Sequence, residues 1–146
     1  MAKSLRIRPI ALAAVRRAED LLVYEGVDRV DGQRIFRPLG GGVEFGERAV
    51  EAVHRELREE LGAELTNVAL LGVLENVFQW EGRPHHEIAF VFAADLVDAS
   101  FYARDQLGKV LDANDEVSWQ PIARFRNPDP SVPTLLPPGL LALLGG

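Results

Sequence analysis

The chain contains no cysteine, which excludes disulfide bonds, thiolate zinc sites and cysteine nucleophiles. It also lacks any apolar segment that approaches the roughly 20 residues of a membrane-spanning helix. Internal repeats and low-complexity linkers are absent as well. At 146 residues, the sequence predicts one domain over 1–146 that is long enough to bury a hydrophobic core. We expect a cytoplasmic protein without a membrane partner.

Basic residues do not gather into a stripe, and the formal net charge is −6 at pH 7. Both features argue against an extended nucleic acid as the main partner, because proteins that bind the phosphate backbone concentrate Lys and Arg on one surface. A small phosphate-containing ligand stays compatible with this charge, since metal ions can screen an acidic site.

Runs of β-branched and aliphatic residues, separated by turn signals, predict several strands. The predicted strands are 7–15, 20–24, 33–39, 67–80, 86–96 and 116–122. The fourth and fifth should pair as a hairpin, because the sequence Glu81-Gly82-Arg83-Pro84 between them is typical of a turn. Residues 99–115 show no clear period and are expected to form a loop, whereas 140–144 should form a short helix.

Three consecutive glycines, Gly40, Gly41 and Gly42, follow the third predicted strand. We expect them to interrupt regular structure, because they lack the side chains that a strand would pack. Helical periodicity begins after Gly46 and should end at Gly62. The apolar stripe predicted to face the sheet consists of Val50, Val53, Leu57 and Leu61. The acidic face lies roughly 110° around the helix and consists of Glu56, Glu59 and Glu60.

The most specific feature of the sequence is a set of seven residues at fixed spacing within 41–63. They are Gly41, Glu47, Arg55, Glu56, Glu59, Glu60 and Gly62. Because each residue type has a background frequency of roughly 6–7 %, a chance match at a given start is on the order of 10⁻⁸. This run resembles the signature of the Nudix (MutT-like) hydrolases, and it departs from that signature at Ala63, where a larger aliphatic residue is usual.

The acidic face of the predicted helix has an energetic cost. Glu56 and Glu60 lie four residues apart with Glu59 beside them, and each like-charge pair costs roughly a few tenths of a kcal/mol in an isolated helix. A hard cation such as Mg²⁺, usually held by one or two carboxylates plus substrate phosphates, offsets that repulsion. Arg55 lies four residues from both Glu51 and Glu59, where it can neutralise the cluster. A solvated helix face is the alternative, which the fixed spacing of the whole run disfavours.

The resemblance implies an α/β/α sandwich with a mixed β-sheet, in which 41–63 forms a loop–helix–loop that binds a divalent metal, Mg²⁺ or Mn²⁺ in its place. It also implies hydrolysis of a nucleoside diphosphate linked to a second group, X, by attack of water on one phosphorus. Glu47 and Arg55 are expected to join the loop to the helix by an ion pair. The implied metal ligands are Glu56, Glu60, Glu59 and the carbonyl oxygen of Gly40.

The general base is expected among the same glutamates. A bound metal neutralises the diphosphate and lowers the pKa of a bound water, and a nearby carboxylate then takes the proton. Glu56 is the first choice and Glu60 the second, because within this family the run does not fix the base. The products would be a nucleoside monophosphate and a phosphorylated X, or pyrophosphate where X is itself phosphate and the α position is cleaved.

Candidate substrate contacts lie outside this run, and each keeps a structural alternative. Phe36 and Arg37 precede the glycines and suit stacking of a base and binding of phosphate, with strand packing as the alternative for Phe36. Phe78 and Trp80 share one side of a predicted strand. They suit the wall of a nucleobase pocket, and a core or interface role is the alternative.

The second half of the chain adds polar candidates. The run His85-His86-Glu87, beside Arg83, suits contact with phosphate or with X, and Glu87 could add a metal ligand. A polar hairpin end is the alternative. Asp115 and Glu116 could approach the metals from a distant loop, although the pattern favours a solvated turn. The apolar segment 135–144 suits either a homodimer interface or packing within the chain.

The sequence carries no tag that identifies the substrate within the resembled family. The rival hypothesis is a Nudix-like sensor that binds a nucleotide without cleaving it. Such modules often lose carboxylates of the run, and this chain keeps them all. The sequence therefore favours a hydrolase.

Overall fold

The computed structural model describes residues 5–109 and 115–145 of the chain. Its strands form one mixed sheet with the order β5-β6-β1-β2-β3-β9, in which β4 pairs with β1, and β8 pairs with both β2 and β7. The elements in chain order are β1 (Ile7–Arg17), β2 (Asp20–Val27), β3 (Arg34–Arg37), β4 (Leu39–Gly42), α1 (Ala49–Leu61), β5 (Leu65–Trp80), β6 (Arg83–Leu96), the 3₁₀ helix η1 (Ala99–Ala103), β7 (Gln106–Lys109), β8 (Glu116–Pro121), α2 (Ala123–Arg126), β9 (Thr134–Leu135) and α3 (Leu140–Leu143).

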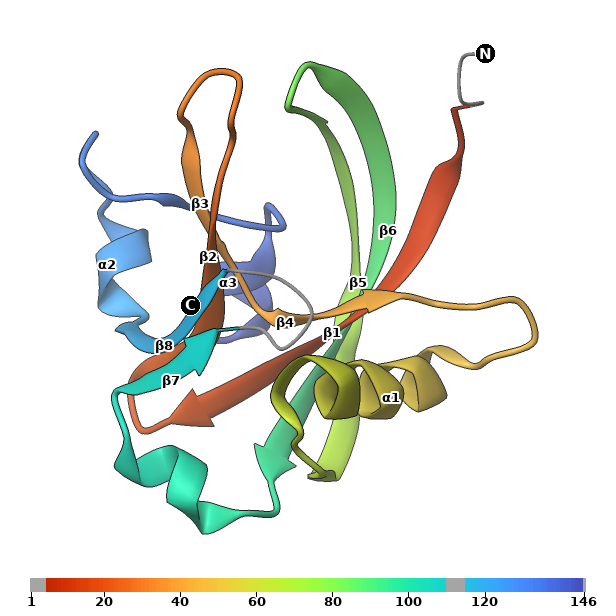
Figure 1. The fold of residues 1–146 in the computed structure, drawn as a ribbon, viewed down its shortest axis with the longest axis vertical. Coiled ribbons are helices and arrows are strands. Elements are labelled where there is room, and N and C mark those ends of the chain that lie inside the picture. Colours follow the sequence, from red (N-terminus) through yellow and green to blue (C-terminus); the bar gives the residue numbers. More distant parts are fainter. Residues whose placement is uncertain (1–4, 110–114, 146) are drawn as a thin grey trace.

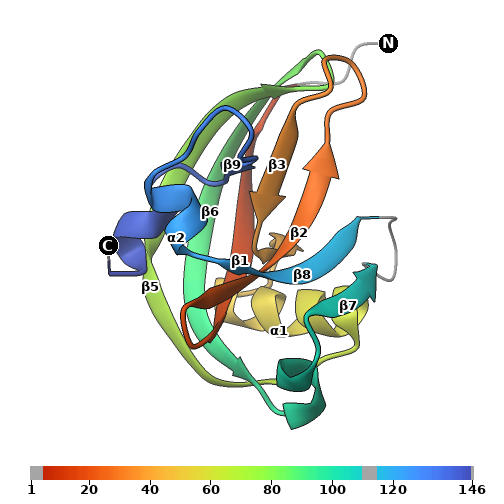
Figure 2. The ribbon, with the colours of Figure 1, turned by 90° about the vertical axis from the view of Figure 1, so that its left-hand side faces the viewer.

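The central strand β1 is buried on both faces, which explains its nearly continuous apolar sequence. Its odd-numbered residues from 11 to 15 pack in a cluster with Leu57 of α1. The even-numbered residues from 10 to 14 pack in a second cluster with Leu140 of α3. Successive side chains of a strand point to opposite faces. Helix α1 therefore covers one face and α2 and α3 the other (Figures 1 and 2), which confirms the α/β/α sandwich.

Two hairpins extend toward the same end of the molecule (Figure 1). One joins β2 to β3 in antiparallel register, and the other joins β5 to β6. Strand β1 pairs with β6 in parallel and with β2 at its far end, from Arg16 opposite Leu21. The hairpins thus belong to two branches of the sheet that meet at β1, and their side chains face a common space.

The three glycines form most of strand β4, so the expected interruption of regular structure is wrong. Gly40 lies opposite Leu12, and Gly42 lies opposite Ile10, in an antiparallel pair with β1. A Cβ atom on Gly40 would lie 2.0 Å from the carbonyl oxygen of Ala11. The missing side chains therefore allow β4 to approach β1 closely, which the composition of the segment alone does not reveal.

Two further expectations need correction. Val50 does not pack against the sheet, since it is 39% exposed; in the first turn of α1 its neighbour Ala49 packs against the core instead. The expected loop over 99–115 contains η1 and β7, while 110–114 lie outside the described residues. Local contacts order this segment, because Ser100 donates its backbone N–H to the Asp98 carboxylate and the Trp119 indole donates to the Phe101 carbonyl.

The apolar C-terminal segment packs within the chain. Leu140 is 1% exposed and Leu144 is 7% exposed, both in the cluster opposite α1. This contact supports the intramolecular alternative for 135–144, and dimerisation stays a prediction. In the described part of the chain, every helix is too short or too polar to cross a membrane.

Candidate active site

Two glutamates of α1 lie against the glycine strand. The Glu56 carboxylate occupies the space beside Gly41, where a Cβ atom would lie 2.6 Å from its carboxyl carbon. Glu60 is 8% exposed and accepts a hydrogen bond of 2.9 Å from the backbone N–H of Gly40. The helix period places both side chains on the same face, and the glycines leave room for them. The result is a pair of carboxylates at one short stretch of backbone.

Arg55 ties this face of the helix to the preceding loop. Its Nε and Nη2 donate to the two carboxylate oxygens of Glu47 at 2.8 and 2.9 Å. It also donates to Glu56 at 3.0 Å, to Glu59 at 3.2 Å and to the Gly42 carbonyl at 2.9 Å. The bidentate bond from Arg55 lowers the pKa of Glu47 from its usual 4.5 to about 2. The expected Glu47–Arg55 ion pair is present.

The helix begins and ends with groups that suit its termini. The backbone N–H of Arg48 donates to Glu51 at 2.9 Å, so the first turn carries a stabilising carboxylate. Gly62 adopts a left-handed φ of 66°, and its N–H donates to the Arg58 carbonyl. Both ends are therefore fixed, which holds the glutamates in place relative to β4.

The donor set of this site fits Mg²⁺. In residues 5–109 and 115–145, no group of three or more His, Asp or Glu side chains is gathered closely enough to hold a metal by itself. Mg²⁺ usually needs only one or two carboxylates, because water and substrate phosphates complete its octahedron. Glu56 and Glu60 supply such a pair, whereas Glu59 is about half exposed and turned to Arg55. The roles of these glutamates and of the Gly40 carbonyl as ligands stay predictions.

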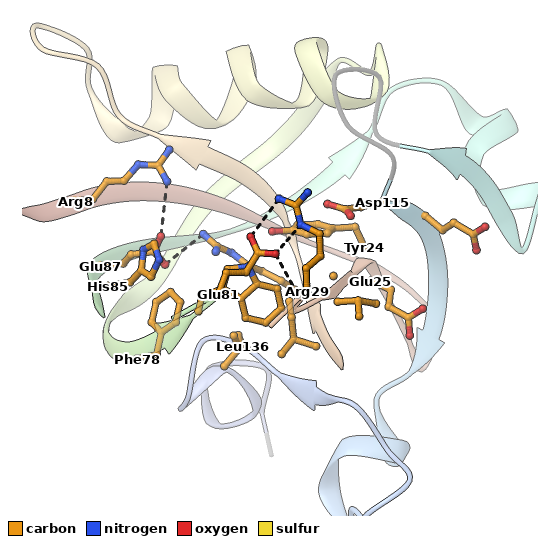
Figure 3. A pocket seen from close by; sticks show the side chains of 16 residues that line it. Arg8, Tyr24, Glu25, Arg29, Phe78, Glu81, His85, Glu87, Asp115 and Leu136 are labelled. Atoms are coloured by element: carbon orange, nitrogen blue, oxygen red, sulfur yellow. Dashed lines mark hydrogen bonds and ion pairs between the residues drawn. The ribbon is translucent and has the colours of Figure 1, made fainter. Parts of the chain in front are cut away.

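A pocket of about 800 Å³ opens between the two hairpins (Figure 3). Arg8, which lines it, lies against Gly42 of the glycine strand. Residues of β1, β2, β3, β5 and β6 line the pocket, together with Asp115 and with Glu116, the first residue of β8. Its lining residues are Arg8, Tyr24, Glu25, Gly26, Val27, Arg29, Ile35, Arg37, Phe78, Trp80, Glu81, His85, Glu87, Asp115, Glu116 and Leu136. This volume lies within the range of small-molecule sites.

Two arginines flank a buried carboxylate at one side of this pocket. Arg8 lies opposite Glu87 in the parallel β1–β6 pair, and the two side chains approach to 3.8 Å. Arg37 approaches the other oxygen of Glu87 to 3.5 Å. Glu87 is 5% exposed, so the two cations compensate a charge that burial would otherwise penalise. Arg8 also lies against Gly42. The arginines therefore extend from the glycine strand into the pocket.

Aromatic rings form another part of the pocket wall. Phe78 and His85 stack with centroids 5.1 Å apart and an interplanar angle of 14°. Trp80 lies two residues along β5 from Phe78 and lines the same pocket. Flat apolar surfaces of this kind suit a nucleobase.

The structure separates the remaining predicted contacts. Phe36 packs in the core, 5% exposed and edge-on against Phe125, because alternation along β3 turns Arg37 toward the pocket and Phe36 away from it. By the same alternation along β6, His85 and Glu87 line the pocket and His86 does not, so the contact expected of His86 stays a prediction. Arg83 lines a smaller neighbouring hollow.

Tyr24 and Asp115 both line the pocket, and burial acts on both. Burial raises the pKa of Tyr24, and the charges that act on it include Arg37, Glu60 and Asp115. Burial also raises the pKa of Asp115, which is half-buried at the pocket. Glu116 is exposed but also lines the pocket. Tyr24 thus lines the pocket within electrostatic reach of Glu60.

The residues that sequence analysis missed come together through strand pairing. Arg8 faces Glu87 across the β1–β6 pair, and Tyr24 faces Arg37 across the β2–β3 pair. Each sits in a segment that was expected to be a strand, but its partner strand was not assigned. The sequence does show a charged or aromatic residue among apolar neighbours at each of these positions. That pattern indicates a candidate residue, but it does not identify the residue opposite it on the neighbouring strand.

Comparison with known proteins identifies the family of the chain. A family model described as NUDIX domain matches residues 6–136. The NAD-capped RNA hydrolase NudC of Mycobacterium bovis is 32% identical over 109 residues, covering 64% of this chain and 34% of the relative. The protein of that name from Pseudomonas aeruginosa is 34% identical over 112 residues, covering 77% and 34%. This chain therefore spans about a third of the length of the curated relatives it matches.

Solved structures agree with the fold. A crystal structure of a MutT NUDIX hydrolase from Burkholderia pseudomallei aligns with a TM-score of 0.67 at 24% identity, covering 95% of this chain and 97% of that one. The solution structure of the E. coli ORF135 protein aligns with a TM-score of 0.57 at 24% identity, covering 96% and 88%. At 24% identity, this structural similarity shows the fold alone.

Proposed function

The chain belongs to the NUDIX domain family, and from that membership we propose that it is a Mg²⁺-dependent pyrophosphohydrolase of a nucleotide or nucleoside-diphosphate derivative. One observation carries the proposal. Glu56 and Glu60 lie together against the glycine strand, and Arg8, which lies against Gly42 of that strand, lines a pocket that also contains Arg37 and stacked aromatic rings. Carboxylates for a metal, cations for phosphate and flat surfaces for a base are the groups that such a substrate requires.

The arrangement suggests how a substrate lies. Its diphosphate would sit between the glutamates of α1 and the Arg8–Arg37 pair, since Arg8 contacts Gly42 and faces the pocket. Its base or X group would lie against Phe78 and Trp80. In this pose the negative charge of the diphosphate meets guanidinium donors on the pocket side.

The reaction follows from these groups. Bound Mg²⁺ would neutralise the diphosphate and polarise its phosphorus. A water oxygen forms a bond to one phosphorus, and the bond from that phosphorus to the bridging oxygen breaks. The bridging oxygen leaves with the second phosphate, and the Glu56 carboxylate, or Glu60 in its place, takes the proton of the attacking water. The products are a nucleoside monophosphate and a phosphorylated X.

The test is release of products from a panel of substrates with Mg²⁺, with Mn²⁺ and with chelator. The panel contains nucleoside triphosphates, ADP-ribose, dinucleoside polyphosphates, NADH and nucleotide sugars. The names of the relatives add NAD and NAD-capped RNA to it. We expect metal-dependent turnover of one substrate class. Tight metal-dependent binding of a nucleotide, with no turnover across the panel, would instead indicate the sensor.

Variants then separate the site from the fold. Glu56→Gln and Glu60→Gln keep the shape of each side chain and remove its charge, so both should lose turnover while circular dichroism stays unchanged. Glu64→Gln changes an exposed glutamate just after α1 and serves as the control. Normal turnover in both site variants would contradict the assignment of these glutamates.

A further inference from the structure

The tips of the two hairpins beside the pocket are joined by reciprocal contacts. Asp28, just after β2, accepts a hydrogen bond of 2.8 Å from the backbone N–H of Glu81, in the turn between β5 and β6. Glu81 accepts hydrogen bonds from the backbone N–H of Arg29 at 3.1 Å and from its Nε at 2.7 Å. We call Asp28, Arg29 and Glu81 the clasp.

The clasp has a buried half and an exposed half. Asp28 is 2% exposed and also accepts from the backbone N–H of Val30, and these backbone donors, that of Glu81 first, lower its pKa. The Arg29 side chain is 87% exposed. Exposed ion pairs stabilise little and are screened by salt. The Arg29–Glu81 half can therefore open while Asp28 keeps the two tips in register.

The backbone of Glu81 gives independent support for a role beyond the turn. Glu81 and Gly82 have φ values of 51° and 76°, and they connect the paired residues Trp80 and Arg83. Two-residue hairpin turns with positive φ at both positions favour Asn, Asp or Gly, and a glutamate there is strained. The conformation of the turn therefore does not explain why residue 81 is a glutamate. The hydrogen bonds between its carboxylate and Arg29 do explain it.

The Arg29–Glu81 pair of the clasp lines two neighbouring hollows. The large pocket of about 800 Å³ and a neighbouring hollow of about 490 Å³ share Arg29, Trp80, Glu81 and His85 in their walls. Figure 3 shows the Arg29–Glu81 pair among the side chains that line the large pocket. Val30 and Arg83 line the smaller hollow and not the large pocket.

We propose that the clasp sets how long a group the pocket accepts, which makes Glu81 and Arg29 specificity-determining residues of the same site. The inference rests on the proposed function. With the clasp closed, the pocket ends at the Arg29–Glu81 pair and takes one nucleoside-sized group. A longer group must displace that pair before it reaches the smaller hollow.

Glu81→Gly is the decisive variant, because it removes the clasp carboxylate and relieves the strained turn, so the hairpin should still fold. Ala18→Gly is its matched control. Ala18 is an exposed residue with the same φ of 51°, in the turn between β1 and β2, away from the pocket. Arg29→Ala opens the clasp from the other hairpin and keeps the backbone N–H that donates to Glu81. Its effect should have the same direction and a smaller size.

The readout is selectivity along two series of substrates. In one series X grows from phosphate to a sugar phosphate to a second nucleoside. In the other, ATP carries alkylamine chains of increasing length on its exocyclic amine. In the series whose growing group enters the pocket, Glu81→Gly should raise kcat/KM of the longest member relative to the shortest by about tenfold. A ratio within about twofold of that of Ala18→Gly in both series would overturn the proposal.

A binding measurement separates failure of the clasp from failure of the proposed function. Trp80 lines the pocket, whereas Trp119 is 5% exposed, so quenching of tryptophan fluorescence reports on pocket occupancy. If the wild-type protein cleaves nothing, AMP and alkylamine-extended AMP still test the clasp, because Glu81→Gly should tighten binding of the extended ligand alone. If Glu81→Gly changes the affinity for both ligands equally, or changes neither affinity, the proposal for the clasp is overturned. Any turnover that is observed would still support the proposed function.

Discussion

Two arginine–carboxylate clusters lie on either side of the glycine strand, and they use their donors differently. Arg55, on the helix side, donates to carboxylates and to one carbonyl at 2.8–3.2 Å. Arg8 and Arg37, on the pocket side, approach Glu87 only to 3.8 and 3.5 Å. These distances exceed the usual hydrogen-bond length of about 3.2 Å.

The difference separates a structural cation from two binding cations. The donors of Arg55 are committed to the loop and to the glutamates, so this residue holds the helix in place. The donors of Arg8 and Arg37 are held near Glu87 by charge but are not bound by it at hydrogen-bond length, so they can turn to a phosphate at small cost. Mutations on the two sides should therefore change different quantities.

The largest effect is expected on the helix side, at the carboxylates. Glu56→Gln should lower kcat by roughly 10²–10⁴-fold, because it removes both a metal ligand and the first-choice base. The thermal midpoint should change little or rise, since one member of a like-charged cluster is neutralised. Steady-state kinetics and calorimetry measure the two quantities. A kcat close to that of Glu64→Gln would contradict this role.

The second effect concerns stability. Arg55→Met should destabilise the fold by roughly 1–3 kcal/mol, because several charge-assisted hydrogen bonds are lost and Glu47 is left without its main partner. Arg58→Met, on the same helix, removes a hydrogen bond to exposed Glu64 and should have a much smaller effect. Urea denaturation of both variants measures the difference. Equal free energies of unfolding would show that Arg55 does not hold the helix.

The third effect concerns substrate binding on the pocket side. Arg37→Gln should raise KM about tenfold, which corresponds to about 1.4 kcal/mol, and should change kcat less. Arg34→Gln is the control, since Arg34 lies on the same strand but pairs with Glu25. If Arg37→Gln instead lowers kcat with KM unchanged, then Arg37 acts in the transition state and the separation of roles is wrong.

The smallest effect is a dependence of stability on pH. Because Arg55 lowers the pKa of Glu47 to about 2 in the folded state, the carboxylate stabilises the fold above its ordinary pKa of about 4.5. That stabilisation should be lost as the pH falls from about 4.5 toward 2. Glu47→Gln removes this titration, so its thermal midpoint should fall less steeply with acid than that of the wild type. Parallel curves would show that Glu47 does not contribute.

The helix side of the site could be predicted from the sequence because its geometry is local. Spacing along a helix fixes which side chains share a face, so the common position of Glu56 and Glu60 followed from the sequence. The Glu47–Arg55 pair was implied by the family resemblance, because Glu47 precedes the helix. The glycine strand was missed, because its backbone pairs with β1 through a contact between segments distant in sequence. The glycine composition suggested an interruption of regular structure, whereas the glycines are required because β4 approaches β1 closely.

The pocket side depends on strand register, which sequence spacing does not supply. A shift of one residue turns every side chain of a strand to the other face. For this reason Arg37 lines the pocket while its neighbour Phe36 packs in the core, which is the alternative that the sequence analysis kept for Phe36. The same parity explains why His85, and not His86, lines the pocket. Arg8 and Tyr24 could be recognised only once their partners, Glu87 and Arg37, were known.

Binding of Mn²⁺, followed by electron paramagnetic resonance, tests the division between the two sides most directly. The titration compares the wild type with the double variants Glu56→Gln/Glu60→Gln and Arg8→Gln/Arg37→Gln, each with and without a nucleoside monophosphate. The account predicts that the glutamate variant loses the bound Mn²⁺ signal and that the arginine variant keeps it but loses its response to the nucleotide. Unchanged Mn²⁺ binding in the glutamate variant would contradict the assignment of the metal site.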